Sequence, residues 1–552
     1  MEIIAKQVSS LEKIRLTEIG DVKEVNWATV LKGEKFSYQI ALQVKGNLKF
    51  DIKVEDTSFK GDVKVYMVQN AIMDMPADIP SEDNFITLEP GLMPDILVPI
   101  EKEKNIMGID NGAGALWIEV SIPEDIEAGK HLITLSMSAG NQYFGEHIEI
   151  KKIMELQVID AVIPKQTTKF TQWFHVDCIA DVHNVPVYSE EHWALIDKYM
   201  AMASQMGINM ILTPVITPPL DTGVGLTRPC TQLVKIEKLG DKFVFDFTLL
   251  DRWIDLCKKN GIEYYEIAHL FSQWGLKYAP NIKVLENGKE DYMFGWHTEA
   301  NCKEYREFLM QFVPAVIKVF ADRGLKDKLH FHLSDEPATD HLPAYKYAYD
   351  LVHPLLEGCP IMDALSHYEF YENGFIDIPV TGVYYIDRFL GKDVKNQWVY
   401  YCCSSFNGTS NRFLSMGSGR NRIMGLQIYK FGIHGFLHWG YNFYYSEHSK
   451  KKINPYITTS GDKCFPSGDP FSVYPYGEDV IPSLRAVVFR DALMDVEICR
   501  MLEAIIGREK VIEMIDEAAG EELTFSKFPR DNNFVPELIE KMKGIIKEHI
   551  GK

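Results

Sequence analysis

The chain has 552 residues, of which 46% are hydrophobic and 25% charged, and its formal net charge is -20. This length exceeds what one ordinary core accommodates, so two or three domains are expected, and the composition is that of a globular protein. The negative charge repels phosphate backbones and gives no help in reaching an anionic membrane, which argues against nucleic acid and membrane partners. A neutral substrate is the expected partner.

The N-terminal segment lacks the apolar core of a secretory signal, because charges interrupt it at Glu2, Lys6 and Arg15. No later stretch is apolar enough to span a bilayer. The nine cysteines are scattered without paired spacing, and Cys402 and Cys403 are neighbours, which favours reduced thiols over a disulfide framework. These features predict a cytoplasmic protein without membrane insertion; they give no indication of oligomeric state.

Residues 1–163 are predicted to form an N-terminal β-sandwich domain. Short segments of alternating polarity, such as 36–42, 116–120 and 131–137, are separated by turns rich in Gly, Pro, Asn and Asp. Such alternation is typical of strands with one buried face.

Residues 164–480 alternate between predicted strands and amphipathic helices. The predicted strands are 169–177, 209–215, 264–270, 329–334, 361–366, 380–386, 398–404 and 435–441. Predicted helices include 191–206, 249–260, 302–323 and 344–356. About eight β-α units over this length favour a (β/α)₈ barrel. A doubly wound open sheet is the alternative, but no Gly-rich phosphate loop opens it.

Residues 481–552 are charged and helical in pattern, with predicted helices at 483–502, 509–519 and 536–549. This segment is expected to be a helical C-terminal extension that packs on the barrel.

The most informative segment is 330–337, which ends in Ser334, Asp335, Glu336 and Pro337. It is a predicted strand, the fourth of the barrel, that proline terminates. Because the C-terminal strand ends of such a barrel form its active-site face, Asp335 and Glu336 are candidate catalytic residues. Repulsion between the two carboxyls can separate their pKa values, so that one donates a proton while the other stays anionic. The alternative is a pair of loop acids that caps the next helix.

Adjacency limits the mechanism that Asp335 and Glu336 can use. Two carboxyls that flank a glycosidic bond must lie about 5–5.5 Å apart for retention or about 6.5–9.5 Å for inversion, and neighbours in sequence are poorly placed for either. They suit substrate-assisted catalysis, in which the 2-acetamido oxygen of the substrate attacks the anomeric carbon. One acid then orients the acetamido group while its neighbour transfers the proton. The pair therefore favours N-acetylhexosamines.

Four segments carry a resemblance to a known family. They are residues 90–95 (Pro-Gly-Leu-Met-Pro-Asp), 333–337 (Leu-Ser-Asp-Glu-Pro), 435–442 (Gly-Phe-Leu-His-Trp-Gly-Tyr-Asn) and 484–495. On these segments the chain resembles glycoside hydrolase family 123, the β-N-acetylgalactosaminidases, over nearly its whole length.

The resemblance implies a β-sandwich, a (β/α)₈ catalytic barrel and a retaining exo-enzyme that works through an oxazoline-type intermediate and needs no cofactor. Asp335 would be the stabiliser that orients the acetamido group, and Glu336 the general acid/base. The substrate would be a terminal β-N-acetylhexosaminide of an oligosaccharide or glycolipid glycan. The residues themselves do not distinguish GalNAc from GlcNAc, so a β-N-acetylglucosaminidase or a broader β-hexosaminidase stays open.

Aromatic and polar residues at other strand ends are candidates for sugar contacts. The predicted substrate-binding residues are Trp173, His175, His269, Tyr385, Tyr401, Trp439 and Asn442. Aromatic rings can stack on pyranose faces, although any one ring is more often part of the core. Tyr385 or Tyr401 is expected to donate its hydroxyl to the acetamido oxygen. The histidines have structural roles as an alternative.

Two other functions compete with the glycosidase. His330 and His332 share a strand face and could bind a metal with His175 or His269, but they precede the strand end and are expected to point into the barrel below its mouth. No metal site is therefore predicted. A carbohydrate-binding protein without activity is the third hypothesis, against which the intact acid pair argues.

Overall fold

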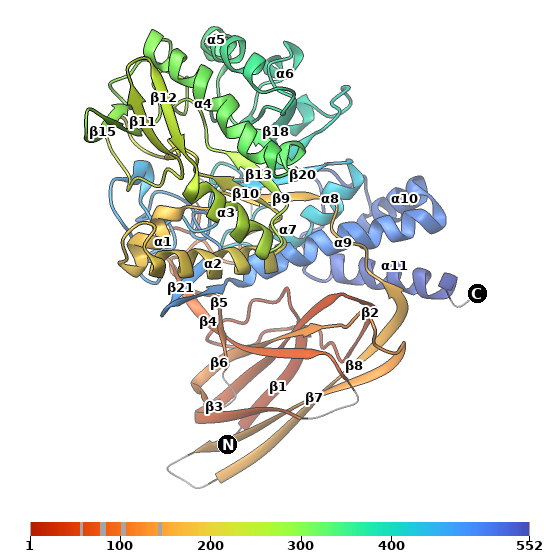
Figure 1. Cartoon of the computed structure of the whole chain (residues 1–552). Helices are drawn as coiled ribbons and strands as arrows, with labels where there is room; N and C mark the ends of the chain where they lie inside the picture. The colour runs from red at the N-terminus through yellow and green to blue at the C-terminus, as the bar shows by residue number, and fades with distance from the viewer. Residues whose placement is uncertain (1, 56–58, 78–83, 101–105, 142–145, 551–552) are drawn as a thin grey trace.

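The computed structural model describes residues 2–55, 59–77, 84–100, 106–141 and 146–550 of the chain. Figure 1 shows a sheet-rich N-terminal region, a strand barrel surrounded by helices, and a group of helices that ends the chain. Within the described residues, no helix combines the length and the apolar character that crossing a membrane requires.

The described residues of the N-terminal region contain eight strands. They are β1 (Glu2–Ser9), β2 (Trp27–Lys32), β3 (Lys35–Glu55), β4 (Asp62–Met73), β5 (Gly91–Pro99), β6 (Ile106–Ser121), β7 (Gly129–Asn141) and β8 (Glu146–Val162). They form one hydrogen-bonded sheet in the order β2-β8-β7-β3-β6-β4-β5, with β1 beside β3. The long strand β3 pairs with β1 and β6, and its C-terminal end pairs with β7. It therefore connects the part of the sheet that contains β7 to the part that contains β6. The predicted strands in this region are confirmed.

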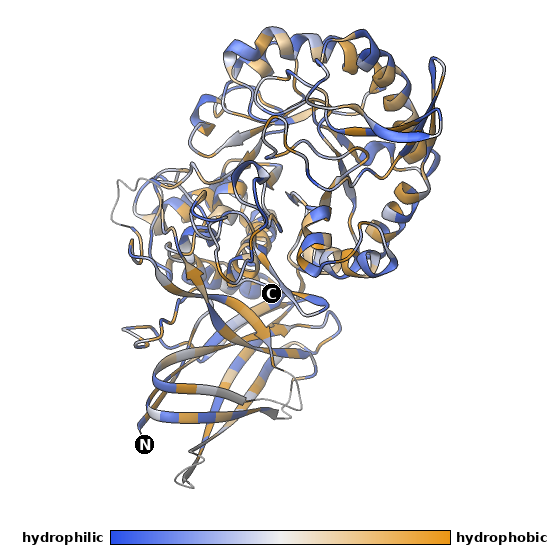
Figure 2. Ribbon diagram, turned by 90° about the vertical axis from the view of Figure 1, so that its left-hand side faces the viewer, coloured by the Kyte–Doolittle hydropathy of each residue, from blue (hydrophilic) through white to orange (hydrophobic). Residues whose placement is uncertain are grey.

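Alternation along β3 explains how this sheet buries both of its faces. Tyr38, Ile40 and Leu42 belong to the core of the N-terminal region, whereas Ala41 belongs to a second cluster with helix α9 (Leu484–Ile506). Successive strand residues point to opposite faces, so one strand serves two cores. Figure 2 shows the resulting bands of hydrophobic and hydrophilic residues along the long strands.

Helix α9 also makes a buried ion pair with the N-terminal region. The Arg485 guanidinium donates to both carboxylate oxygens of Asp95 on β5, at 2.8 and 2.9 Å, and the Tyr474 hydroxyl donates to the same carboxylate at 2.6 Å. Two segments that are distant in sequence but both part of the family resemblance, 90–95 and 484–495, therefore meet at this interface.

Eight parallel strands form the barrel. They are β9 (Lys169–Gln172), β10 (Met210–Thr213), β13 (Tyr264–Ile267), β16 (Leu329–Phe331), β17 (Met362–Leu365), β18 (Ile378–Gly382), β19 (Trp398–Tyr400) and β20 (Gly435–His438). Their order is β16-β13-β10-β9-β20-β19-β18-β17, and a parallel bridge between Phe331 and Ile361 nearly closes the ring. All eight predicted strands are confirmed, although each is shorter than predicted. Closure excludes the open doubly wound sheet.

Helices cover the outside of the barrel. They are α1 (Val176–His183), α2 (Glu190–Gln205), α3 (Thr248–Lys259), α4 (Lys303–Asp322), α5 (Leu342–Val352), α6 (Glu369–Glu372), α7 (Gly419–Arg422) and α8 (Met424–Lys430). The four predicted helices of this region correspond to α2, α3, α4 and α5. Between β18 and β19 the described chain has only the 3₁₀ turn Ile386–Arg388, so the count of eight complete β-α units is corrected at this step.

The end of the chain is helical, as predicted. Helix α9 is the first α-helix after β20, and α10 (Arg508–Ala519) and α11 (Phe534–Ile550) pack on it. The domain limits 1–163, 164–480 and 481–552 stay predictions. Helix α9 lies in the predicted C-terminal segment and contacts the barrel helix α8.

Long loops at the C-terminal strand ends carry elements that the sequence did not predict. A four-stranded sheet in the order β12-β11-β14-β15 is formed by β11 (Lys235–Leu239), β12 (Lys242–Asp246), β14 (Ile282–Glu286) and β15 (Lys289–Phe294). The loop after β20 contains the hairpin β21 (Val473–Tyr476) and β22 (Asp479–Pro482). Short 3₁₀ turns lie at Lys326–Lys328, Thr339–His341, His353–Leu355 and Glu447–Ser449.

Candidate active site

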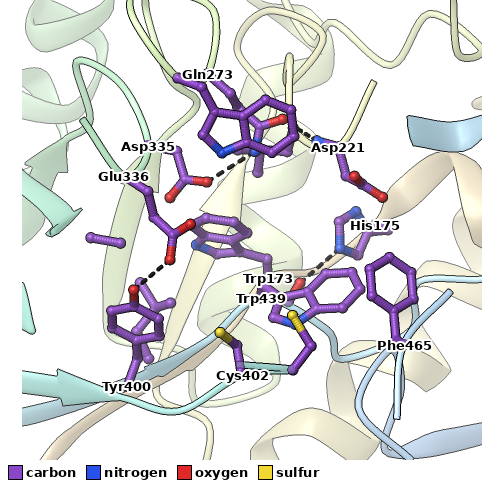
Figure 3. Close-up of a pocket in the computed structure, with 15 residues that line it drawn as sticks. Trp173, His175, Asp221, Gln273, Asp335, Glu336, Tyr400, Cys402, Trp439 and Phe465 are labelled. Atoms are coloured by element: carbon purple, nitrogen blue, oxygen red, sulfur yellow. Dashed lines mark hydrogen bonds between the residues drawn. The ribbon is translucent and has the colours of Figure 1, made fainter. Parts of the chain in front are cut away.

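A pocket opens at the C-terminal ends of the barrel strands, where both acids of the predicted pair lie (Figure 3). Its cavity volume is about 120 Å³. The lining residues are Trp173, His175, Leu220, Asp221, Gln273, Trp274, Asp335, Glu336, Ala364, Tyr400, Cys402, Cys403, Leu437, Trp439 and Phe465. Apolar rings and a few polar groups thus surround the two carboxyls.

The backbone that carries the acid pair is fixed by its neighbours. Strand β16 ends at Phe331, and the Asp363 carboxylate accepts hydrogen bonds from the amides of Leu333 and Ser334 at 3.1 and 3.3 Å. The Glu336 amide donates to the Ala364 carbonyl at 3.0 Å. Strand β17 therefore holds the acid pair through both its backbone and one side chain.

Glu336 has an unusual backbone conformation. Its φ is +45°, in the left-handed region that a β-carbon disfavours, and Pro337 follows it. Such strain persists only where surrounding contacts impose it, and it occurs preferentially at functional sites.

The Asp335 side chain is buried beside Gln273. The Gln273 Nε2 donates to Asp335 Oδ2 at 2.9 Å, and the Gln273 carbonyl oxygen accepts from the Asp221 amide, which fixes the orientation of the glutamine. Within the part of the chain that the structure describes, no group donates a hydrogen bond to the other oxygen of Asp335, Oδ1, so this atom is available to a ligand in the pocket.

The Glu336 side chain lines the pocket and is more exposed than that of Asp335. The Tyr400 hydroxyl donates to Glu336 Oε1 from strand β19, which β17 and β18 separate from β16 in the barrel. One oxygen of the carboxyl is thereby held in place, and the second can carry a proton towards a substrate.

Both carboxyls have raised pKa values. Burial and the neighbouring Glu336 charge raise the pKa of Asp335 well above its usual range, against the Gln273 hydrogen bond. Burial of the carboxyl against the pocket wall raises the pKa of Glu336 as well, and the Tyr400 hydrogen bond opposes this shift. The pair therefore retains one shared proton to higher pH than an isolated carboxyl does.

The Tyr400→Phe substitution is expected to move the pH dependence of activity. The tyrosine hydroxyl stabilises the Glu336 anion, so its loss raises the pKa of Glu336 further. A general acid loses function as pH rises through its pKa, so the basic limb of the kcat/KM profile should shift to higher pH. Tyr401→Phe is the matched control, because that hydroxyl bonds Asn421 away from the pocket. A limb that stays in place in Tyr400→Phe contradicts the assignment.

A buried charged layer lies beneath the acid pair. His332 donates to Glu266 at 3.0 Å through Nε2 and to Asp363 at 3.1 Å through Nδ1, and all three side chains are fully buried. Burial alone would lower the pKa of His332, but the hydrogen bonds and charges of Asp363 and Glu266 outweigh it and raise this pKa to about 9. At neutral pH an imidazolium therefore separates two carboxylates.

His332→Gln is expected to destabilise the barrel by about 3–5 kcal/mol near pH 6.5, because removal of the imidazolium leaves the buried acids without their counter-charge. The folded-state pKa is raised, so this stabilisation is complete below the unfolded value of about 6.5 and is lost as pH rises through about 9. The difference in thermal unfolding midpoint between wild type and variant should therefore shrink from pH 6.5 to pH 9.5. His330→Gln serves as the control, since burial lowers the pKa of His330 to about 3.

The geometry of the histidines does not favour the metal hypothesis. His269, His332 and Asp363 have ligand atoms within 4.8 Å of one another. However, the rings of His269 and His332 stack with centroids 4.2 Å apart at 14°, so their in-plane lone pairs run parallel and do not converge on one point. His330 lies apart and contacts Lys169 at 3.1 Å.

Three predicted substrate-binding residues line the pocket: Trp173, His175 and Trp439. Buried carboxylates orient both indoles, since Trp173 Nε1 donates to Glu266 at 3.1 Å and Trp439 Nε1 donates to Asp469 at 2.9 Å.

His175 contributes a wall rather than a free hydrogen-bonding group. Burial and Arg228 lower the pKa of His175 to about 3, so the ring is neutral. Its Nε2 donates to the Trp439 carbonyl at 3.0 Å, and its Nδ1 accepts from Arg228 at 3.2 Å.

The other four predicted substrate-binding residues do not line the pocket. Tyr401 is buried against Phe436, and Tyr385 lies on the surface with 40% of its area exposed. His269 lies in the layer below, stacked on His332. Asn442 bonds the amide and the carbonyl of His175 at 2.8 and 3.0 Å, so it fixes the wall from behind.

Several lining residues were missed by sequence reasoning. Asp221, Gln273, Trp274 and Phe465 come from long loops whose position no periodicity predicts. The Oδ2 atom of Asp221 is buried and has no hydrogen-bond partner among the described residues. A buried carboxylate oxygen without a donor is costly, so a ligand hydroxyl in the pocket would satisfy it.

Comparison with known proteins supports a catalytic barrel. The family profile of the glycoside hydrolase 123 catalytic domain matches residues 173–502. A family 123 glycoside hydrolase from Clostridium perfringens, described in terms of glycolipid glycan hydrolysis, is similar in structure, with a TM-score of 0.74 and 15% sequence identity; the similarity covers 100% of this chain and 98% of that one. A β-glucuronidase from Parabacteroides merdae has a TM-score of 0.33 at 10% identity, over 89% of this chain and 51% of that one. No curated protein matches the sequence.

Proposed function

Since the chain belongs to glycoside hydrolase family 123, and is thus a glycoside hydrolase with a carbohydrate substrate, we propose that it is a retaining exo-β-N-acetylgalactosaminidase. The observation that carries the mechanism is the placement of Asp335 and Glu336 on one short segment, side by side on the same pocket wall. Carboxyls so placed do not flank a bond from opposite sides, so the substrate must supply the nucleophile.

In the first step, the acetamido oxygen bonds to the anomeric carbon as the glycosidic bond breaks. The electrons of that bond go to the leaving oxygen, which takes the proton of Glu336. Asp335 accepts a hydrogen bond from the acetamido N–H through Oδ1, and its negative charge balances the positive charge of the oxazolinium that forms. This hydrogen bond favours the Asp335 anion, so the proton shared by the pair resides on Glu336 when substrate is bound.

In the second step, Glu336 removes a proton from water, which attacks the anomeric carbon from the face that the aglycone left. The bond to the acetamido oxygen breaks, and the sugar is released with its original anomeric configuration. The Tyr400 hydroxyl holds Glu336 in place through both proton transfers.

The pocket walls support recognition of a terminal sugar. Trp173 and Trp439 offer rings for the pyranose and the acetamido methyl group, and Asp221 accepts a sugar hydroxyl through its unpartnered Oδ2. Trp274 is 45% exposed at the rim, where it is placed to contact the aglycone. We propose an oligosaccharide or a glycolipid glycan as the natural substrate.

Comparison of aryl β-glycosides tests the proposal directly. Aryl β-GalNAc should be hydrolysed, and the aryl β-galactoside, which lacks the internal nucleophile, should react at least about 10³-fold more slowly. The thiazoline analogue of the intermediate should inhibit competitively. Equal rates on the two substrates exclude substrate assistance, and faster turnover of aryl β-GlcNAc replaces the stated sugar with GlcNAc. Sugar binding by calorimetry without turnover of any of these compounds identifies a non-catalytic protein.

A further inference from the structure

Two adjacent cysteines lie in the wall of the active-site pocket. Strand β19 ends at Tyr400, and Cys402 and Cys403 come directly after Tyr401; both cysteines line the pocket. Both are free thiols. Figure 3 shows Cys402 between Tyr400 and Trp439, close to the position proposed for the sugar.

The backbone turn explains why two neighbouring side chains face the same cavity. In a continuing strand they would point to opposite faces. Here the Cys402 carbonyl accepts from the Ser405 amide at 2.9 Å and from the Asn411 side chain at 2.9 Å, so the strand ends and the chain turns. The amide of Cys403 bonds the Asp469 carboxylate. The backbone that carries both thiols is thus held in place.

The two thiols reach one cavity from neighbouring positions in the chain. The Cys402 sulfur lies 3.3 Å from the Ser404 hydroxyl. The neighbouring Cys402 side chain and burial raise the pKa of Cys403 well above its usual range, and the carboxylates of Asp469 and Glu336 add smaller contributions. Reagents that need a thiolate are therefore disfavoured, whereas a soft acceptor that binds two thiols at once gains from the arrangement.

We propose that Cys402 and Cys403 form a dithiol binding site for trivalent arsenicals, and that its occupation blocks the sugar pocket. The reaction with phenylarsine oxide is balanced without an oxidant. Two S–H bonds break, two As–S bonds form, and the oxide oxygen leaves as water with the two thiol protons, while arsenic stays trivalent. The cyclic product would place a phenyl ring beside Trp439 and Tyr400.

The experiment treats the reduced full-length protein with phenylarsine oxide and follows two readouts. Intact mass should show one dithiol adduct per chain, and peptide mapping should place it at Cys402 and Cys403. Hydrolysis of aryl β-GalNAc should be lost in proportion to the modified fraction. A dithiol such as 2,3-dimercaptopropanol should restore activity, whereas an equal concentration of a monothiol should not.

Variants separate this site from other thiols. Cys402→Ser, Cys403→Ser and the double variant should lose the dithiol adduct and, relative to their own untreated rates, resist inhibition. Cys302→Ser is the matched control. Cys302 is a half-buried thiol outside the pocket; it caps the N-terminus of helix α4, and a serine can fill the same capping role. It should bind the arsenical as wild type does.

The two readouts keep this proposal distinct from the proposed function, on which its inhibition arm rests. An adduct that persists in the double variant, or maps elsewhere, overturns the site. An adduct at the pair with full activity overturns the blocking claim. If aryl β-GalNAc is not hydrolysed at all, the proposed function fails, and the mass arm still decides whether the dithiol site exists.

Discussion

Replacement of Glu336 by Gln should reduce hydrolysis of substrates with poor leaving groups by about 10²–10⁴-fold, the usual contribution of general acid catalysis. The amide keeps the shape of the side chain and can still contact Tyr400, but it has no proton to transfer. Activated aryl substrates need little protonation, so their first step should be affected much less. The measurement is kcat/KM for a series of aryl β-GalNAc substrates of increasing leaving-group pKa.

The expected signature is a steeper dependence of rate on leaving-group pKa in Glu336→Gln than in wild type. Glu307→Gln on the exposed face of helix α4 makes the same chemical change away from the pocket and should behave as wild type. Added azide, a nucleophile that needs no general base, should rescue the second step in the variant. A uniform loss across the series argues that Glu336 does not protonate the leaving group.

Replacement of Asp335 by Asn should reduce kcat for every aryl β-GalNAc by about 10²–10³-fold, as expected when a preorganised electrostatic contact to the transition state is removed. Asp335 is buried, and Gln273 donates a hydrogen bond to it at 2.9 Å, so its carboxylate is fixed where the proposed mechanism develops positive charge on the acetamido group. Because this charge develops whatever the aglycone is, the loss should not depend on the leaving group. The same substrate series therefore distinguishes the roles of the two adjacent acids.

Asp335→Asn has a second expected consequence that involves the thiazoline inhibitor. This inhibitor carries the ring of the intermediate, so the variant should bind it more weakly by about the factor lost in kcat. Asp322→Asn at the exposed end of helix α4 is the control. Unchanged affinity for the thiazoline in Asp335→Asn would place Asp335 outside the stabilising role and would leave the substrate-assisted mechanism without its partner residue.

The sequence predicted the strands of the barrel because each is a short apolar run between clear breaks. All eight were located, and the segment with Asp335 and Glu336 was assigned to the fourth strand. The C-terminal ends of parallel barrel strands meet at one face, so a strand assignment is sufficient to predict that both acids lie at the active-site face. The predicted C-terminal helices were found for a similar reason, since their polarity pattern is regular.

The directions in which individual side chains point were harder to predict from the sequence. Tyr401 was predicted to face the sugar, yet its neighbour Tyr400 lines the pocket and bonds Glu336, while Tyr401 packs outside the barrel. Successive strand residues alternate between faces, so an error of one position exchanges inside and outside. Two adjacent tyrosines carry no signal that fixes this choice.

The pocket walls were decided by tertiary structure. Asp221, Gln273, Trp274 and Phe465 lie in long loops without periodicity, and they meet Asp335 and Glu336 only because the barrel brings the ends of β10, β13, β16 and β20 to one rim. The His332 layer likewise depends on contacts with Glu266 and Asp363, which are 66 and 31 residues away. The sequence by itself determined the barrel and the two acids, because strand patterning and strand ends are local. The raised pKa values and the shape of the pocket were decided by the tertiary structure, because they arise from burial and from charges that distant segments supply.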